Sequence, residues 1–381
     1  MPNLKPEVEA FARIKVVGVG GSGSNAVDHM IHSKVRGVDF VAVNTDMQDL
    51  HHTSANKKIH IGKNLTKGLG AGMNPEIGRQ AAEETRDEIQ EVLKGADMVF
   101  VTCGFGGGTG TGASPVVAHS AKSQGILTIG VVTKPFTFEG AERGRLAEEG
   151  LARLRENVDA LIVIPNDRLL AATSKDTTFL SAFAMSDDIL RQAVEGISDL
   201  IMLPGIINVD FADVRAIMQN AGSALMGVSS ATGEKRAEEA ARGAINSPLL
   251  DFSIDGAKGV LFAIAGGPDM TLWEIQEAAK IITESMDKSA RVIFGAIHDE
   301  RLRKNELKIT VIAAGFPEKA NMKPLFSLPG QKDEPILKIK KPEPRPIEEP
   351  VIEKSVVGEK NDKNDESWDA IPAFLRRSRK M

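Results

Sequence analysis

A run of glycines at residues 104–112 constrains the fold of this chain more than any other feature. Five of the seven positions from 106 to 112 are glycine, and the other two are Thr109 and Thr111. Glycine loses more backbone entropy on folding than any other residue, so such a run needs a structural reason. It lies between an apolar segment typical of a buried strand and a helical pattern. Backbone N–H groups at a strand-to-helix turn bind anions, so the run predicts a phosphate cradle.

A second glycine cluster, at residues 18–25, also follows a strand pattern and opens a helix. Alone, its G-x-G-x-x-G spacing favours an NAD enzyme, with Asp39 or Asp46 as the acid on the ribose. A dehydrogenase has no use for a second cradle, however, whereas one nucleoside triphosphate can occupy both. The run at 104–112 contains no lysine, so backbone N–H groups and a metal ion, most simply Mg²⁺, must meet the phosphate charge.

Short apolar runs alternate with amphipathic segments from residue 13 to about 167. This alternation predicts a doubly wound α/β sheet of parallel strands. The clearest helix is 74–95, with Asn74 as its N-cap, Pro75 at its first position and Gly95 at its end. The predicted strands are 13–20, 38–46, 58–62, 98–105, 125–136 and 158–167.

A second α/β half is predicted for residues 222–317. A long helix, about 187–203, separates it from the first half, and a loop that runs into a helix follows at 208–220. The last two predicted strands have no helix between them, so the second sheet is expected to be mixed. Its predicted strands are 224–230, 259–265, 290–297 and 307–314, and its helices are 234–246 and 271–287.

The composition changes at about residue 331. Residues 331–366 hold 18 charged residues and 5 prolines without apolar periodicity, which predicts a disordered linker.

The net charge of −5 argues against non-specific nucleic-acid binding. Cys103 is the single cysteine, so an internal disulfide is impossible and a reducing compartment is indicated. We expect Cys103 to be a small residue of the core. No apolar run approaches the ~18 residues of a membrane span, so we expect a soluble protein.

The run at 106–112 resembles the signature loop of the tubulin/FtsZ family of GTPases, and the resemblance covers residues 11–317 and the C-terminal tail. It implies an α/β fold with a Rossmann-like parallel-sheet GTPase domain, a long central helix and a smaller mixed-sheet domain. The other matching segments are 44–46, 68–72, 74–75, 133–136, 165–167 and 208–215. The implied parts are a disordered N-terminus (1–12), the GTP-binding domain (13–186), the central helix (187–207), the C-terminal tubulin-like domain (208–317), a disordered linker (318–366) and a partner-binding peptide (367–381).

Carried over position by position, the resemblance implies a site for GTP and GDP. The two glycine clusters would hold the phosphates, and Ala71 with Gly72 would lie near the γ-phosphate. Glu139 and Arg143 would hold the ribose and a phosphate, although their spacing by itself predicts only a surface ion pair. The residues implied for the phosphate and ribose end are Gly20, Gly21, Ser22, Gly23, Ser24, Asn25, Asn44, Asp46, Ala71, Gly72, Gly104, Gly106, Gly107, Gly108, Thr109, Gly110, Thr111, Gly112, Thr133, Pro135, Glu139 and Arg143.

Asn166, Phe183 and Asp187 are implied around the guanine. The Watson–Crick edge of guanine offers N–H donors that suit a carboxylate such as Asp187, whereas adenine would leave that carboxylate poorly paired. Without the resemblance, Phe183 would be read as a core aromatic residue.

Asn208, Asp210 and Asp213 are the candidate catalytic residues. From spacing alone, Asp210 is the N-cap of a helix. The resemblance implies that this loop enters the nucleotide site of the next subunit, where Asp210 and Asp213 orient or polarise the water that attacks the γ-phosphate and Asn208 assists. Both interpretations can hold together, because a capped helix start would fix the carboxylates in place.

The last fifteen residues form a short amphipathic segment. Its apolar residues fall at helical spacing behind the predicted linker, which is the layout of a helix-in-groove ligand. The segment resembles the family's C-terminal peptide, which docks onto membrane-tethering partners, and this favours a bacterial source. The residues that lead into it, 365–369, depart modestly from the acidic, Asp-Tyr-like pattern that is usual in the family. The implied contact residues are Trp368, Ile371, Pro372, Phe374, Leu375 and Arg376.

The sequence thus predicts a cytoplasmic GTPase that polymerises head-to-tail with itself and acts in the division ring at midcell. GTP or GDP, Mg²⁺ and K⁺ are the expected ligands. Partners are expected at the tail, with no nucleic acid and no direct membrane insertion. The alternatives are an NAD(P)-dependent oxidoreductase, a structural filament of the same fold that does not hydrolyse, and a tubulin-like DNA-segregation protein.

Overall fold

The computed structural model describes residues 12–171, 177–203, 205–247, 254 and 256–316. The predicted linker at 318–366 and the tail at 367–381 lie outside the described residues. Within the described part, eleven strands form one sheet in the order β3-β2-β1-β4-β5-β6-β8-β11-β9-β10-β7. The strands are β1 Ile14–Val19, β2 Val38–Asn44, β3 Lys57–His60, β4 Met98–Gly104, β5 Leu127–Lys134, β6 Ala160–Pro165, β7 Gly205–Ile207, β8 Gly222–Thr232, β9 Gly259–Gly266, β10 Arg291–His298 and β11 Glu306–Ala314.

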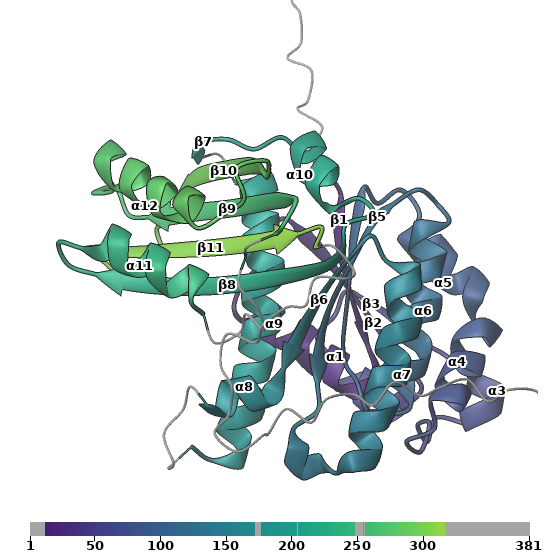
Figure 1. Ribbon diagram of the computed structural model, residues 1–381. Coiled ribbons are helices and arrows are strands. Elements are labelled where there is room, and N and C mark those ends of the chain that lie inside the picture. Colours follow the sequence, from purple (N-terminus) through teal and green to yellow (C-terminus); the bar gives the residue numbers. More distant parts are fainter. Residues whose placement is uncertain (1–11, 172–176, 204, 248–253, 255, 317–381) are drawn as a thin grey trace, which may run out of the picture. The chain divides into compact units, whose positions relative to one another are not determined.

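Helices cover both faces of the sheet (Figure 1). The first-half helices are α1 Gly20–His32, α2 Met47–His52, α3 Lys63–Thr66, α4 Pro75–Glu84, α5 Arg86–Leu93, α6 Thr109–Lys122, the short 3₁₀ helix η1 Thr137–Glu139, α7 Ala141–Asn157 and α8 Asn166–Ala171. The remaining helices are α9 Phe179–Met202, α10 Phe211–Met218, α11 Arg236–Ile245 and α12 Leu272–Glu284.

The six strands of the first half are all parallel, as predicted. From β1 the chain continues to β2 and β3 on one side and then to β4 on the other. The order therefore reverses between β1 and β4, and ligands of open α/β sheets bind at such a switch point. Helices α1 and α9 contribute to the core on one face, and α4 to α7 contribute to the core on the other. The two glycine runs follow β1 and β4, so the topology brings them together.

The second half has the expected mixed sheet. Strand β11 lies between β8 and β9 and is antiparallel to both, whereas β10 is parallel to β9. This sheet is not separate from the first, because β6 pairs with β8 in parallel and Ala160 faces Gly222. The predicted central helix (187–207) is wrong at its end, because α9 stops at Met202 and Gly205–Ile207 form the edge strand β7, which is antiparallel to β10. Helices α11 and α12 share a third core cluster with β9 and β11.

Two predicted helices have different bounds. The helix predicted for 74–95 is two helices, because Thr85 leaves helical geometry at φ −112° and ψ 20°. The Thr85 hydroxyl donates to the carbonyl of Ala81 (3.3 Å), and such side-chain bonds compete with regular helix geometry. The predicted cap is confirmed, since Asn74 accepts the N–H of Glu76 (3.0 Å).

The long helix α9 begins at Phe179 rather than at 187. The side chain of Thr178 accepts the N–H of Ser181 (3.2 Å) and caps this earlier start. Residue 187 therefore lies inside the helix instead of at its beginning. None of the helices in the described part is long and apolar enough to span a membrane.

Candidate nucleotide-binding site

The two glycine runs meet in space. A Cβ added at Gly20 would lie 2.8 Å from the backbone nitrogen of Gly110, and one at Gly104 would lie 2.6 Å from the hydroxyl of Ser22. These contacts are closer than side chains allow, so glycine is required for the loops to touch. The loops therefore form one continuous cradle, as predicted from their shared position after a strand.

The cradle presents two helix N-termini. Helix α1 follows Val19 and helix α6 follows Gly108, and no described side chain caps either of them. The first N–H groups of a helix need partners, and the helix dipole favours an anion there. A Cβ at Gly107 would meet no described atom within 4 Å, so the cradle is open at this position. The geometry suits a phosphate chain bound largely by backbone groups.

A cavity of about 270 Å³ lies over the cradle. Fifteen of the predicted ligand-binding residues line it, together with Val19, Phe105 and Ser186, which were not predicted. The predicted residues that line it are Gly20, Gly21, Ser22, Gly104, Gly107, Gly108, Thr109, Gly110, Thr133, Pro135, Glu139, Arg143, Asn166, Phe183 and Asp187.

Several residues of the glycine runs support the cradle without lining the cavity. The hydroxyl of Thr111 accepts the N–H of Gly106 (3.0 Å), so both groups are used within the loop. A Cβ at Gly112 would overlap the carbonyl oxygen of Pro75, and one at Gly23 would lie 2.6 Å from the carbonyl oxygen of Thr102. Gly112 is therefore needed for packing of α6 on α4, and Gly23 for packing of α1 on β4, and their assignment to the phosphates stays a prediction.

The remaining predicted phosphate residues lie at the rim. The Asn44 amide donates to Asp49 (2.6 Å), and Asp46 caps α2 by accepting the N–H groups of Gln48 and Asp49. Asp49 in turn lies 3.5 Å from where a Cβ of Gly21 would be. These residues therefore position α2 against the first loop rather than line the cavity.

Ala71 lies behind the second loop. It is buried, and its Cβ is 2.8 Å from where a Cβ of Gly108 would be. Gly72 beside it has φ +55° and faces open space. Ser24 is buried and its hydroxyl has no partner among the described residues, while Asn25 is exposed on α1.

One end of the cavity is suited to a flat polar base. Asn166 is buried, and its side-chain oxygen accepts from the hydroxyl of Ser186 (3.0 Å). The ring of Phe183 stands edge-on to that of Phe136, with centroids 5.3 Å apart. Burial raises the pKa of Asp187 to about 6, and the nearby His29 acts in the opposite direction. A partly buried carboxylate with no salt bridge of its own among the described residues can accept hydrogen bonds from a ligand.

Glu139 and Arg143 lie between the base end and the cradle. Arg143 donates to Glu139 (3.2 Å), and the other oxygen of Glu139 accepts the N–H of Phe136 (2.9 Å). The predicted i,i+4 pair is therefore present, and it lines the cavity instead of open surface. Arg143 is the only Lys or Arg among the described lining residues, so the side chains supply little positive charge.

The candidate catalytic loop is far from this cavity. Asp210 caps α10 by accepting the N–H of Ala212 (3.1 Å), which confirms the predicted cap. Asn208 accepts the N–H of Gly205 (2.6 Å). Figure 1 shows α9 running from α8 at the bottom of the view to β7 and α10 at the top. From Asp187 to the end of α9 is a rise of ~23 Å, so one chain cannot bring both sets together.

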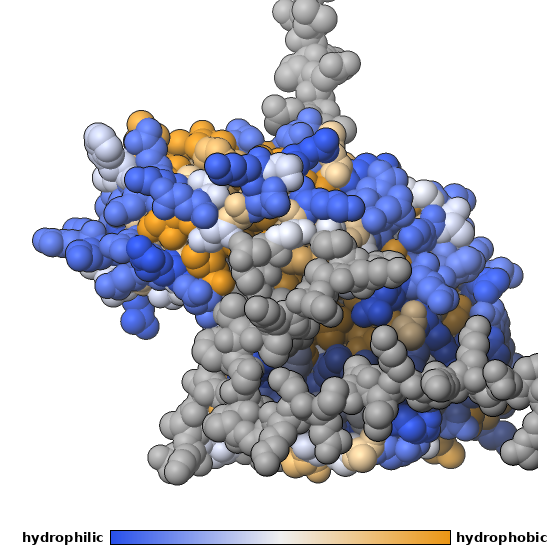
Figure 2. Space-filling view, in the orientation of Figure 1, coloured by the Kyte–Doolittle hydropathy of each residue, from blue (hydrophilic) through white to orange (hydrophobic). Residues whose placement is uncertain are grey.

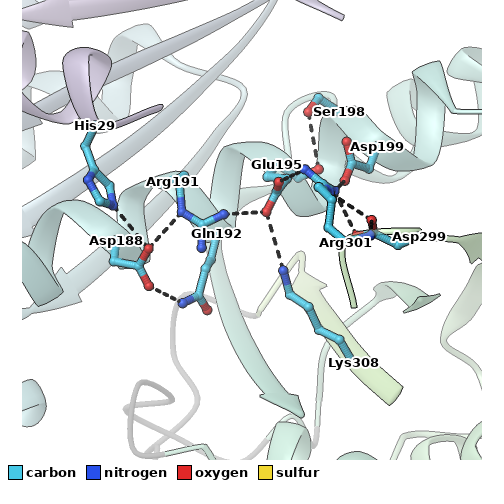
Figure 3. A network of polar contacts seen from close by, with 10 residues as sticks. All are labelled: His29, Asp188, Arg191, Gln192, Glu195, Ser198, Asp199, Asp299, Arg301 and Lys308. Carbon is cyan, nitrogen blue, oxygen red and sulfur yellow. Dashed lines mark hydrogen bonds and ion pairs between the residues drawn. The ribbon is translucent and has the colours of Figure 1, made fainter. Parts of the chain in front are cut away.

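A network of ion pairs follows α9 from the cavity to the second half of the chain (Figure 3). Asp188 accepts from Arg191 (2.8 Å), and Arg191 donates to Glu195 (2.6 Å). Glu195 is only 3% exposed and also accepts from Arg301 (2.6 Å) and Lys308 (3.4 Å) of the second half. The buried carboxylate of Glu195 thus joins α9 to β11 and to the turn before it.

The comparisons with known proteins agree with this architecture. Residues 13–174 match the GTPase domain of the Tubulin/FtsZ family, and residues 222–317 match the C-terminal domain of the FtsZ family. An empty FtsZ dimer from M. jannaschii is 44% identical with a TM-score of 0.78, and the match covers 85% of this chain and 95% of that chain. A tryptophan-to-tyrosine point mutant of M. jannaschii FtsZ is 46% identical with a TM-score of 0.77, and the match covers 80% of this chain and 92% of that chain.

A more distant structure shares the fold. CetZ2 from Haloferax volcanii, solved as a GTPγS-bound protofilament, is 23% identical with a TM-score of 0.68, covering 80% of this chain and 94% of that chain. The M. jannaschii relatives are archaeal, so the bacterial source suggested by the tail stays a prediction. With both domains matched and similar structures over most of its length, the chain belongs to the FtsZ family and is a tubulin-like GTPase that binds GTP and converts it to GDP.

Proposed function

We propose that this GTPase assembles head-to-tail and hydrolyses GTP at a site that two subunits share. The observation that supports this is the separation of parts. Phe183, Ser186 and Asp187, near the start of α9, line the cavity. The exposed residues Asp210 and Asp213 belong to α10 and its cap, and α10 lies near the other end of α9 in Figure 1. A group that positions a water must be within ~3 Å of it, directly or through one further water. The loop of one subunit therefore acts in the cavity of the next.

Within that shared site each part has a distinct task. The backbone N–H groups of the two glycine runs bind the phosphates, and Asn166 with Asp187 reads the guanine. Asp210 and Asp213 of the neighbour orient the attacking water and accept its proton as its oxygen bonds to the γ-phosphorus. The bond from the γ-phosphorus to the β–γ bridging oxygen breaks, and GDP is the leaving group, while Asn208 holds the loop. Asp213 suits this role because its side chain is exposed and pairs with no described residue.

Mg²⁺ fits the donor set of this site. No group of three or more His, Cys, Asp or Glu side chains in the described residues could hold a metal ion. Mg²⁺ commonly binds substrate phosphates and waters with few protein ligands, so the nucleotide itself would supply most of its coordination. The ion would neutralise phosphate charge that Arg143 alone cannot meet. K⁺ is proposed as a second cation on the same grounds of charge.

Exposed apolar side chains support self-association at both ends. Leu69, Met73, Phe138 and Leu180 flank the loops that line the cavity. Ile206, Leu272 and Trp273 are exposed in the second half. Figure 2 shows hydrophobic residues among hydrophilic ones on the surface of that half. Two different surfaces that fit each other form a heterologous contact, which does not close and makes filaments.

Filaments of this kind would act in a division ring in the cytoplasm, with the tail as the site for tethering partners.

Sedimentation with nucleotide tests the assembly directly. The purified chain with Mg²⁺ and K⁺ should pellet with GTP and return to the supernatant as GTP is consumed, whereas GDP should leave it soluble. Equal amounts in the pellet with GTP, with GDP and without nucleotide would contradict nucleotide-dependent assembly.

A further inference from the structure

His29 links the helix that follows the first glycine loop to the helix that carries Asp187. It lies on α1, nine residues after Gly20, whose loop forms part of the phosphate cradle. Its Nε2 is 3.2 Å from Oδ1 of Asp188 on α9 (Figure 3). Asp188 directly follows Asp187, which lines the base end of the cavity. One side-chain contact therefore spans the helix that carries the phosphate loop and the helix that carries the guanine carboxylate.

Asp188 is held from more than one direction. Its Oδ1 accepts from Arg191 (2.8 Å) as well as lying near His29, and its Oδ2 accepts from Gln192 (2.7 Å). Arg191 and Gln192 belong to α9 itself, so His29 is the partner from outside the helix. This arrangement fixes the Asp188 carboxylate on α9, and His29 adds a polar contact from α1 to the apolar packing between the two helices.

We propose that His29 and Asp188 are positioning residues for guanine recognition. Consecutive side chains on an α-helix point ~100° apart. The rotation of α9 about its axis that lets Asp188 reach His29 therefore also sets the direction of Asp187. The His29 contact holds that rotation against α1. The distance between the phosphate loop and the Asp187 carboxylate is then fixed before the nucleotide arrives, which lowers the cost of binding.

This inference rests on the proposed role of Asp187, which accepts hydrogen bonds from the guanine edge. It assigns no contact between His29 and the nucleotide. The contact is half-exposed, with side-chain exposures of 36% and 39%, so its contribution to overall stability is small. Its effect should instead appear as a loss of discrimination between bases.

The test compares GTP with inosine triphosphate, which lacks the 2-amino group of guanine. We expect the wild-type chain to bind GTP more tightly, and His29→Ala to lower the ratio of the two affinities about fivefold, which corresponds to ~1 kcal/mol. Affinity for inosine triphosphate should change much less. His29→Gln, which keeps a side-chain N–H donor, should restore most of the ratio. A loss of fold would lower both affinities together and is therefore distinguishable.

His32→Ala is the matched control, because His32 is an exposed histidine on the same helix that contacts the carbonyl of Asp28 instead of α9. It should leave the ratio unchanged. In a double-mutant cycle, Asp188→Ala should add little once His29 is removed. An unchanged ratio in His29→Ala, with a clear wild-type preference for GTP, would overturn this inference alone. A wild-type chain that does not distinguish the two nucleotides would instead overturn the proposed role of Asp187.

Discussion

Asp187 is the residue through which we expect GTP binding to depend on pH. Burial raises the pKa of Asp187 to about 6, while His29 opposes the shift. The guanine N–H donors need the ionised carboxylate, so nucleotide binding should favour loss of this proton. GTP affinity should be constant above about pH 7 and fall as pH drops through 6, approaching about tenfold per unit. Isothermal titration from pH 8 to 5 measures this.

Asp187→Asn is the companion variant for that titration. It should bind GTP weakly and without the pH dependence, because the amide offers one acceptor and does not titrate in this range. The folded chain holds the carboxylate at a raised pKa, so its ionisation opposes folding, and the variant should be at least as stable as wild type at pH 7. A wild-type affinity that is flat down to pH 5 would contradict the assignment.

Asp213 is the residue whose replacement should separate binding from hydrolysis. It is exposed, and α10, which carries it, lies near the end of α9 that is far from Asp187. Asp213→Ala should therefore bind GTP as wild type does and lose about 10²-fold or more of its turnover, the usual scale for a group that positions a water or accepts its proton. Nucleotide binding and phosphate release measured on the same sample test this. Weakened binding with normal turnover per bound nucleotide would show that Asp213 is not catalytic.

At the residue scale, most residues that line the cavity could be predicted from the sequence, whereas the contacts that support them could not. The glycine runs, Asn166, Phe183 and Asp187 all contribute to the cavity lining, because each lies in a motif with a recognisable pattern. Thr111 and Gly112 belong to the same motif but serve loop geometry and helix packing. A pattern of residue types does not say which atoms of a loop face inward. Ser186 was missed, although it directly precedes Asp187 and holds Asn166.

Helix α9 depends on a buried carboxylate for its contact with the second half. Glu195 faces Arg191, Arg301 and Lys308. Glu195→Ala would remove the carboxylate that the three cations share, although Arg191 would keep Asp188 and Arg301 would keep Asp199 and Asp299. Removing one partner of a buried ion network is costly. Because the three cations are partly exposed, we expect a loss of ~2 kcal/mol in the free energy of unfolding. Chemical denaturation followed by circular dichroism measures it.

The control for that variant is Glu284→Ala on α12. Glu284 and Lys280 form an exposed i,i+4 pair (3.8 Å), and such pairs contribute at most ~0.5 kcal/mol. If the two variants were equally stable, the network along α9 would not hold the second half in place.

At the element scale the strands were predicted closely and the helix ends less so. The six parallel strands are short apolar runs between turn residues, and this signal is local. The break at Thr85 and the start of α9 at Phe179 depend on single side-chain hydrogen bonds, from Thr85 and Thr178. The pairing of β6 with β8 joins residues 160 and 222, which no local pattern can reveal.

The tail should act independently of assembly. The cavity and the candidate catalytic loop are both built from residues that precede the predicted linker. Deletion of 367–381 should therefore leave GTP turnover and sedimentation near wild type and abolish binding to a membrane-tethering partner. Loss of sedimentation in the truncated chain would show that the tail contributes to assembly.

At the scale of the whole molecule, the proposed mechanism places the nucleotide cavity and the catalytic loop at opposite ends of α9. Asp187 and the far end of α9 are ~23 Å apart along the helix axis, which exceeds the reach of any hydrogen bond by far. A single subunit should therefore bind GTP and hydrolyse it very slowly. Hydrolysis should begin only when the loop at 208–215 of one subunit enters the cavity of the next.

The measurement that tests this account most directly is GTP turnover per subunit across a dilution series in Mg²⁺ and K⁺. Turnover should be near zero at low concentration and rise steeply above a threshold that coincides with the onset of sedimentation. Asp213→Ala mixed with wild type should lower the rate per wild-type subunit, because each interface uses a loop from one chain and a cavity from another. A rate per subunit that is the same at every concentration would mean that one chain holds a complete site, and the shared-site account would be wrong.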